Sequence, residues 1–233
     1  MTIRQIILDT ETTGLDPAHG HRIIEIGCVE MVNRRFTGNN FHHYLDPGRD
    51  SDEAALEVHG LTREFLAGKP QFSAIAAELA AFVKGAQIII HNAPFDLAFL
   101  DAELARVKLP AFRTQVDSVI DSLVMAKEAH PGKRNNLDAL CDRYGVSHSQ
   151  RTLHGALLDS TLLAEVYLAM TRGQNGFMMD EHGTDAREAG GEELAGPLES
   201  FVAHASADEL AAHTALLCGI AKESRKPAVW QVA

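Results

Sequence analysis

Cysteine and long apolar runs are both scarce in this sequence. Its 233 residues hold three cysteines, Cys28, Cys141 and Cys218, which lie far apart without the spacing of a metal site. We expect reduced thiols and a cytoplasmic protein, since disulfides are rare in the cytoplasm. No apolar stretch reaches the roughly 18 residues of a membrane span, and the first residues lack the apolar core of a signal peptide. We therefore expect no membrane partner.

Positive charge is scarce as well. The chain has 21 Lys and Arg residues against 32 Asp and Glu residues, which gives a formal net charge of −11. Such a balance argues against bulk electrostatic capture of DNA or RNA. It does not exclude an enzyme that meets a phosphate chain through bound cations, because carboxylates gathered at one site would themselves make the protein acidic.

The first 172 residues alternate strand-like and helix-like patterns. Short β-branched or apolar runs predict strands, and apolar residues at helical spacing predict helices. The strands are expected at 3–8, 22–31, 36–45 and 87–90, and the helices at 72–83, 95–107, 117–129, 137–144 and 157–168. Three early strands followed by alternating helices and strands predict one α/β domain with a mixed sheet over residues 1–172.

The composition changes after residue 172. Residues 173–197 are rich in glycine and acidic residues, which predicts a flexible linker. Residues 198–220 carry apolar residues that predict one or two short amphipathic helices, within a tail (198–233) too small to form a core alone. The tail either packs back on the domain or folds on a partner. A loose tether favours the partner.

Two acidic residues end the first predicted strand. Asp9 and Glu11 stand in the run LDTETTG, and residues two apart in a strand point to the same face. Two carboxylates so close repel each other unless a cation neutralises them. The pattern predicts a cation site. A solvated turn after the strand would explain it too.

Two further polar groups occur later in the chain. The run HNAPFD (91–96) follows an apolar strand and places Asp96 near a helix start, where Asp96 would also suit the helix dipole and Asn92 a cap. In the run HGALLD (154–159), five positions of helix span about 140°. His154 and Asp159 therefore converge only if His154 precedes the helix or lies in its first turn.

The order of these groups is more specific than any one of them. A strand-borne Asp-x-Glu, then Asn-x-x-Phe-Asp, then His-x4-Asp resembles the DEDDh 3′–5′ exonucleases over about residues 3–170. Within them, the stretches NRRFTGNNFH, PGKRNNLDALC and RTLHGALLD look like the proofreading epsilon subunits of bacterial DNA polymerase III. The resemblance implies a ribonuclease H-like mixed sheet flanked by helices.

The chemistry expected of these residues is phosphodiester hydrolysis. Two Mg²⁺ or Mn²⁺ ions suit hard oxygen ligands, which Asp9, Glu11, Asp96 and Asp159 would supply. His154 would act as general base, because histidine ordinarily has a pKa of ~6.5. All five residues are thus expected to be catalytic.

The resemblance also implies a set of residues that bind the terminal nucleotide. They are Thr10, Thr12, Thr13, Gly14, His59, Asn92 and Phe95. His59 is equally explained as a structural histidine. Related proteins carry a sugar-binding Glu where the ungapped register here gives Ala54, between Glu53 and Glu57. Such a site would remove a mispaired 3′-terminal nucleotide from DNA without reading sequence, since a mismatch costs less to unpair.

Partners follow from the same resemblance. Besides a DNA 3′ end, the tail is expected to bind the catalytic alpha subunit of the polymerase, with Trp230 as an anchor. Residues 174–179 lie where related proteins carry a sliding-clamp peptide, though a plain linker explains them too. A small third core subunit accompanies the family in some bacteria. The alternatives are a DEDDh exonuclease acting on RNA ends and a mainly structural replicase subunit.

Overall fold

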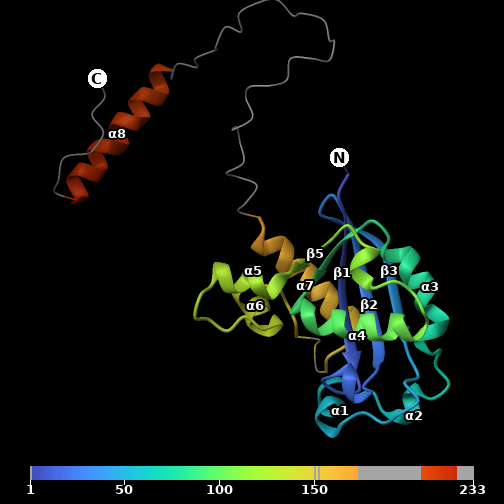
Figure 1. Ribbon diagram of the computed structural model, residues 1–233. Helices are drawn as coiled ribbons and strands as arrows, with labels where there is room; N and C mark the ends of the chain where they lie inside the picture. Colours follow the sequence, from blue (N-terminus) through green and yellow to red (C-terminus); the bar gives the residue numbers. More distant parts are fainter. Residues whose placement is uncertain (1, 150, 152, 173–205, 225–233) are drawn as a thin grey trace, which may run out of the picture. The chain divides into compact units, whose positions relative to one another are not determined.

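The structure, a computed structural model, describes residues 2–149, 151, 153–172 and 206–224 (Figure 1). These residues fall into two units, each described here by itself. The first runs from strand β1 to helix α7, and the second is helix α8 (Ala207–Ser224). The predicted linker, 173–197, lies outside the described residues. Of the predicted tail, 198–233, the structure describes residues 206–224.

The sheet of the first unit has five strands in the order β3-β2-β1-β4-β5. β1 (Arg4–Thr12) pairs antiparallel with β2 (Ile23–Val32), which pairs antiparallel with β3 (Arg35–Tyr44). On its other side β1 pairs parallel with β4 (Gln87–Ile90), which pairs parallel with β5 (Ser118–Asp121). This topology confirms the predicted mixed sheet.

The described residues of the same unit form seven α-helices. They are α1 (Glu53–His59), α2 (Arg63–Leu66), α3 (Phe72–Val83), α4 (Ala93–Arg106), α5 (Ser122–Ala129), α6 (Leu137–Tyr144) and α7 (Ala156–Met170), with short 3₁₀ turns at Pro17–His19 and Phe112–Thr114. No helix among the described residues is long and apolar enough to cross a membrane.

The central strand β1 is buried on both faces. Ile6 and Leu8 belong to a core with α3 and α4, whereas Ile7 belongs to a second core with α7 on the opposite face (Figure 1). Side chains alternate along a strand, so Asp9 and Glu11 share the face of Ile7. The acidic end of β1 therefore lies on the side of the sheet that α7 covers.

One predicted helix is wrong at its start. Residues 118–121, expected as the first turn of a helix over 117–129, form β5 instead, and α5 begins only at Ser122. Val119 pairs with Ile88 of β4. A four-residue strand depends on this long-range ladder, which no local pattern reveals.

Other differences concern short or peripheral elements. Helices α1 and α2 were not predicted, because each buries a single residue, His59 and Leu66, and so lacks an apolar stripe. One or two short helices were expected over 198–220. In the part of the tail that the structure describes, 206–224, an 18-residue helix continues to Ser224.

Candidate active site

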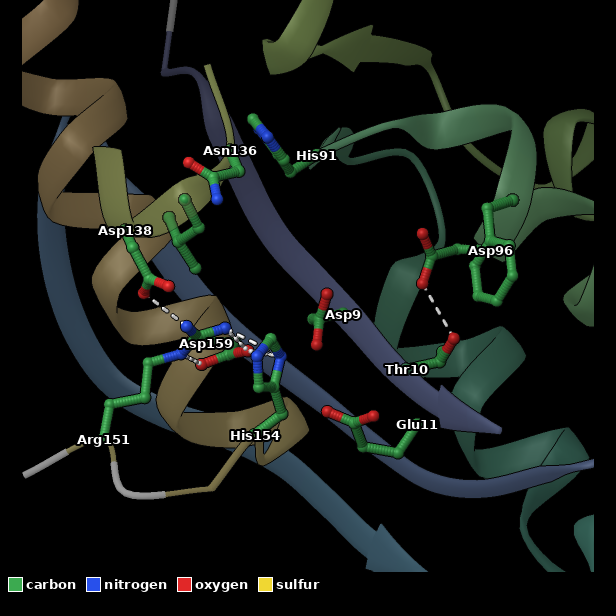
Figure 2. A pocket seen from close by; sticks show the side chains of 12 residues that line it. Asp9, Thr10, Glu11, His91, Asp96, Asn136, Asp138, Arg151, His154 and Asp159 are labelled. Atoms are coloured by element: carbon green, nitrogen blue, oxygen red, sulfur yellow. Dashed lines mark hydrogen bonds and ion pairs between the residues drawn. The ribbon is translucent and has the colours of Figure 1, made fainter. Parts of the chain in front are cut away.

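The end of β1 sends polar side chains to both faces of the sheet. Asp9 and Glu11 point to the side of the sheet that α7 covers, and Thr10 between them points to the other face; all three line one cavity at the end of the strand (Figure 2). There the Thr10 hydroxyl donates a hydrogen bond of 2.7 Å to Oδ1 of Asp96. The strand thereby positions two carboxylates directly and a third through Thr10.

Asp96 reaches the site because the chain turns sharply between β4 and α4. Asn92, at the N-cap position of α4, has a φ of 67°, in the left-handed region. Its backbone N–H donates to Oδ1 of Asp121 at 3.1 Å, and its side chain makes no capping bond. Asp96 lies in the first turn that follows and is 3% exposed. It therefore both complements the helix dipole and faces the cavity.

Asp159 lies close to Asp9 because β2 has a glycine there. Gly27 pairs with Asp9, and a Cβ atom on Gly27 would lie 2.3 Å from the backbone nitrogen of Leu157. Without that atom, the first turn of α7 rests directly on the sheet. The Ser160 hydroxyl fixes this contact by donating to the carbonyl of Gly27 at 2.9 Å.

His154 lies just before α7, as the spacing requires. Its backbone N–H donates to the carbonyl of Val58 at 3.1 Å, which ties the segment to α1. Its Nδ1 atom is 3.3 Å from Oδ2 of Asp159, and its side chain is 44% exposed. The predicted convergence of His154 and Asp159 is therefore present.

A cavity of about 300 Å³ joins these groups. Figure 2 shows the side chains that line it: Asp9, Thr10, Glu11, His91, Phe95, Asp96, Asn136, Leu137, Asp138, Arg151, His154 and Asp159. All five residues expected to be catalytic are in its wall. Of the seven residues expected to bind the nucleotide, the wall includes Thr10 and Phe95 only.

Three of the other expected residues hold the chain after β1. The Thr12 hydroxyl donates to the carbonyl of Gly14 at 2.7 Å, and the Thr13 hydroxyl accepts from the backbone N–H of Arg22 at 3.0 Å. At Gly14 a Cβ atom would lie 2.3 Å from the ring of His21. These contacts explain the three residues by local structure.

His59 is buried at the end of α1 with one ring nitrogen left over. Its Nδ1 accepts from the backbone N–H of Leu61 at 2.9 Å, so the neutral ring carries its proton on Nε2. The Nε2 atom has no hydrogen-bond partner among the described residues. Burial and the nearby His154 lower the pKa of His59. One nitrogen is structural, and the other remains a free donor.

The carboxylates on the β1 side are hard to ionise. Burial, then repulsion from Asp159 and other acids, raises the pKa of Glu11 to about 8. Burial likewise raises the pKa of Asp96 to about 7. Burial, then repulsion from Asp96 and Glu11, raises the pKa of Asp9 well above its usual range. Bound cations would reverse these shifts.

Asp159 behaves differently, although it is 4% exposed. Burial would raise its pKa, but the two hydrogen bonds and the charge of Arg151, with His154 close by, outweigh that effect and leave the pKa below its usual range. Arg151 and its second partner, Asp138, were not predicted as site residues. The only hint was an arginine three residues before His154 in a polar segment.

The donors fit divalent metal ions. Glu11, His154 and Asp159 each offer a ligand atom, and these atoms lie within 4.8 Å of one another. Asp9 and Asp96 add buried or half-buried carboxylates whose charge needs neutralising. Oxygen-rich donor sets of this kind suit Mg²⁺ or Mn²⁺ better than soft metals.

Comparison with known proteins gives a consistent result. A family model described as "Exonuclease" matches residues 6–167. The chain is 47% identical to the DNA polymerase III subunit epsilon of Pasteurella multocida, across 98% of this chain and 93% of that protein. It is 49% identical to the subunit of the same name from Escherichia coli K12, across 92% of each.

The chain belongs to the exonuclease family and, within it, to the DNA polymerase III epsilon subunits. Solved structures share the fold at lower identity. Exonuclease X in complex with 5′ overhanging duplex DNA is 24% identical, with a TM-score of 0.56 over 73% of this chain and 93% of that one. The zinc-bound E. coli exonuclease I–ssDNA complex has a TM-score of 0.65 over 75% and 41%, at 19% identity. Family membership confirms the predicted fold and the predicted enzyme class, a metal-dependent 3′–5′ DNA exonuclease.

Proposed function

We propose that this chain removes mispaired 3′-terminal nucleotides from DNA as the proofreading subunit of a replicative polymerase. One observation carries the proposal: four carboxylates from β1, α4 and α7 and the imidazole of His154 line a single cavity. Carboxylates from three elements, held by Thr10, Asn92 and Gly27, form a charge cluster that a merely structural subunit would not need.

Asp9, Glu11, Asp96 and Asp159 would hold two Mg²⁺ or Mn²⁺ ions. When bound, such ions neutralise the phosphate and favour deprotonation of water. Asp9 would lie at the centre of this ligand set, since both Asp96 and Glu11 are near enough to repel its charge. The four carboxylates would thus place a phosphodiester between β1 and the first turn of α7.

His154 would take the proton of the attacking water. The water oxygen then bonds to phosphorus, the bond from phosphorus to the 3′ oxygen of the preceding nucleotide breaks, and that oxygen receives a proton. The products are a nucleoside 5′-monophosphate and a strand shorter by one residue. The partly exposed imidazole, on the segment before α7, has the access to solvent that this role needs.

The terminal nucleotide would lie against Thr10 and Phe95. Phe95 packs on Phe99 with ring centroids 5.1 Å apart and still lines the cavity, so its ring can stack on a base. The unpartnered Nε2–H of His59 is a donor for the sugar or phosphate. Thr12, Thr13, Gly14 and Asn92 would act by shaping the backbone around this end.

Selection of mismatches requires no reader of base edges. The strand must leave its template to reach the cavity, and unpairing costs less at a mismatch. A nuclease that accepts any unpaired 3′ end therefore removes errors first.

The tail is proposed to bind the catalytic alpha subunit. Helix α8 begins with a capping box, in which Ser206 and Glu209 bond each other's backbone N–H, and it leaves Leu210 and Leu216 exposed. Residues 173–197 would be the linker, with a clamp-binding peptide at 174–179, both outside the described residues. A small third core subunit and a cytoplasmic location complete the proposal. The cysteines, Cys28, Cys141 and Cys218, are free thiols.

The test is 3′-end digestion by the purified chain with Mg²⁺ or Mn²⁺. The substrates are a mismatched primer–template, a matched one and an RNA of equal length, and Asp9→Ala controls for contaminating nucleases. Faster loss of the mismatched DNA end, absent in the variant, supports the proposal. A preference for RNA would move the protein to RNA processing. No digestion with either ion would favour the structural role.

A further inference from the structure

Arg151 binds both oxygens of the Asp159 carboxylate. Its Nε donates to Oδ1 at 2.5 Å and its Nη2 to Oδ2 at 2.6 Å. Such a bidentate pair is the strongest that arginine forms with a carboxylate. The arginine side chain is 6% exposed and that of Asp159 is 5% exposed, so water weakens the pair little.

The guanidinium has two more partners in the cavity. Its Nη1 donates to Oδ1 of Asp138, which lies in the first turn of α6, and its Nη2 lies 2.8 Å from Nδ1 of His154 (Figure 2). Among the described residues that line the cavity, Arg151 is the only lysine or arginine, beside five carboxylates. Its guanidinium therefore supplies positive charge to a site that also fits metal cations.

These contacts conflict with the roles proposed for their partners. A metal ligated by Asp159 needs the oxygens that Arg151 holds, and two cations on one carboxylate repel each other. A guanidinium can only donate, so Nδ1 of His154 accepts from it and the neutral ring keeps its proton on Nε2. In that tautomer neither ring nitrogen is free to accept a proton from water.

We propose that Arg151 is a gate on metal binding, which must release Asp159 and His154 before the site is loaded. Released, the guanidinium remains on Asp138. This inference rests on the proposed function, because it takes Asp159 as a metal ligand. Arg151 acts through Asp159 and His154 and is a positioning residue.

The position of Arg151 in the chain suits such a movement. Asp138 and Asp159 are fixed in the first turns of α6 and α7. Arg151 itself belongs to no helix or strand, and its backbone N–H donates to the carbonyl of His148 at 3.0 Å, so the guanidinium would move through the torsions of its long side chain. The carboxylates of Asp138 and Asp159 are thus anchored on helices. The guanidinium, which binds both of them here, can release Asp159 and keep Asp138.

The test measures Mn²⁺ binding rather than activity. The free Mn²⁺ signal in electron paramagnetic resonance gives the dissociation constant for the full chain and for Arg151→Lys. Lysine keeps the charge but cannot hold both oxygens of Asp159 in a fork. We expect Arg151→Lys to bind Mn²⁺ roughly ten-fold more tightly, in the usual range of coupling between two sites. An unchanged or weaker affinity overturns the gate.

A second variant tests the role of Asp138, the residue that keeps the guanidinium after Asp159 is released. Asp138→Asn removes the charge of this carboxylate, so Arg151 should hold Asp159 more firmly. Mn²⁺ binding should then weaken about five-fold. In the double variant, Asp138→Asn should have little further effect, because its action runs through Arg151. An equal loss in both backgrounds would mean a direct charge effect and overturn the proposal.

Controls separate the gate from folding and from the proposed function. Arg4→Lys alters a similar pair, Arg4 with Glu30, at the far end of β1, and should leave Mn²⁺ binding unchanged. Thermal unfolding with a chelator checks that each variant folds, and Asp138→Asn carries the test if Arg151→Lys does not. Mn²⁺ binding equal in wild type and Asp9→Asn would instead overturn the metal site, and the gate with it.

Discussion

The two sides of the cavity stabilise their buried carboxylates in different ways. On the β1 side, burial and mutual repulsion raise the pKa values of Asp9, Glu11 and Asp96. On the α7 side, Asp159 is as deeply buried, yet Arg151 holds its pKa below the usual range. One side needs cations from solution, and the other has a cation of its own.

This difference shows that burial alone does not decide the state of a carboxylate. Asp96 and Asp159 are 3% and 4% exposed, and both lie in the first turn of a helix. The hydrogen bond from the Thr10 hydroxyl is too weak to offset the burial of Asp96, whereas a bidentate guanidinium more than offsets that of Asp159. The hydrogen-bond donor beside a buried carboxylate therefore decides whether its pKa rises or falls.

The largest effect should follow from loss of the central carboxylate. Asp9→Asn keeps the shape of the side chain but removes its charge, and we expect exonuclease activity to fall by about 10⁴-fold, since metal chemistry supplies several kcal/mol. Single-turnover digestion of a mismatched primer measures it. Activity within ten-fold of wild type would exclude Asp9 as a metal ligand. Asp16→Asn, on an exposed turn after β1, is the matched control.

His154→Ala tests the α7 side without removing a carboxylate. The proposed general base should contribute about 10²–10³-fold to turnover. Mn²⁺ affinity should change little, because the four carboxylates remain. A loss of Mn²⁺ binding as large as the loss of turnover would instead make His154 a metal ligand. Comparison of both quantities in one preparation decides between the two roles.

Gly27→Ala should force the first turn of α7 away from the sheet, and with it Asp159 away from Asp9. The new Cβ would meet backbone atoms of α7 at 2.3–2.5 Å, which cannot shift cheaply. Overpacking of this kind costs about 1–3 kcal/mol, and we expect roughly ten-fold lower activity with a melting temperature several degrees lower. Gly155→Ala is the matched control, since its Cβ would only contact Glu25 at 3.9 Å. Equal effects of the two substitutions would contradict the proposed close contact.

The raised pKa values also predict how stability depends on pH. With pKa values of about 8 for Glu11 and about 7 for Asp96, the folded chain binds more protons than the unfolded chain above about pH 4. The free energy of unfolding should therefore fall as the pH rises from 5 to 8. With a chelator present, we expect the melting temperature to drop by about 5 °C. Saturating Mn²⁺ should flatten this slope, and Glu11→Gln should reduce it.

The sequence predicted the groups that local spacing controls. Helices α3 and α6 and strand β4 have the predicted bounds, because apolar periodicity sets them. Asp9 and Glu11 share a face because strand geometry requires it. The convergence of His154 and Asp159 followed from helix geometry once His154 was placed before the helix.

Long-range contacts were beyond the reach of the sequence. Strand β5 depends on pairing with β4, and the role of Gly27 depends on where α7 crosses the sheet. Arg151 joins Asp138 to Asp159 across 13 and 8 residues, a contact that no spacing rule indicates. Five of the residues expected to bind the nucleotide lie outside the cavity wall, which the sequence pattern alone could not indicate.

The most direct test of the two-sided site is the melting temperature of Asp9→Asn and Asp159→Asn at pH 8 with a chelator. Asp9→Asn removes a repelling carboxylate, so its melting temperature should rise by about 2–4 °C. Asp159→Asn leaves Arg151 buried with a weaker partner, so its melting temperature should fall by at least as much. Shifts of the same sign would contradict the account.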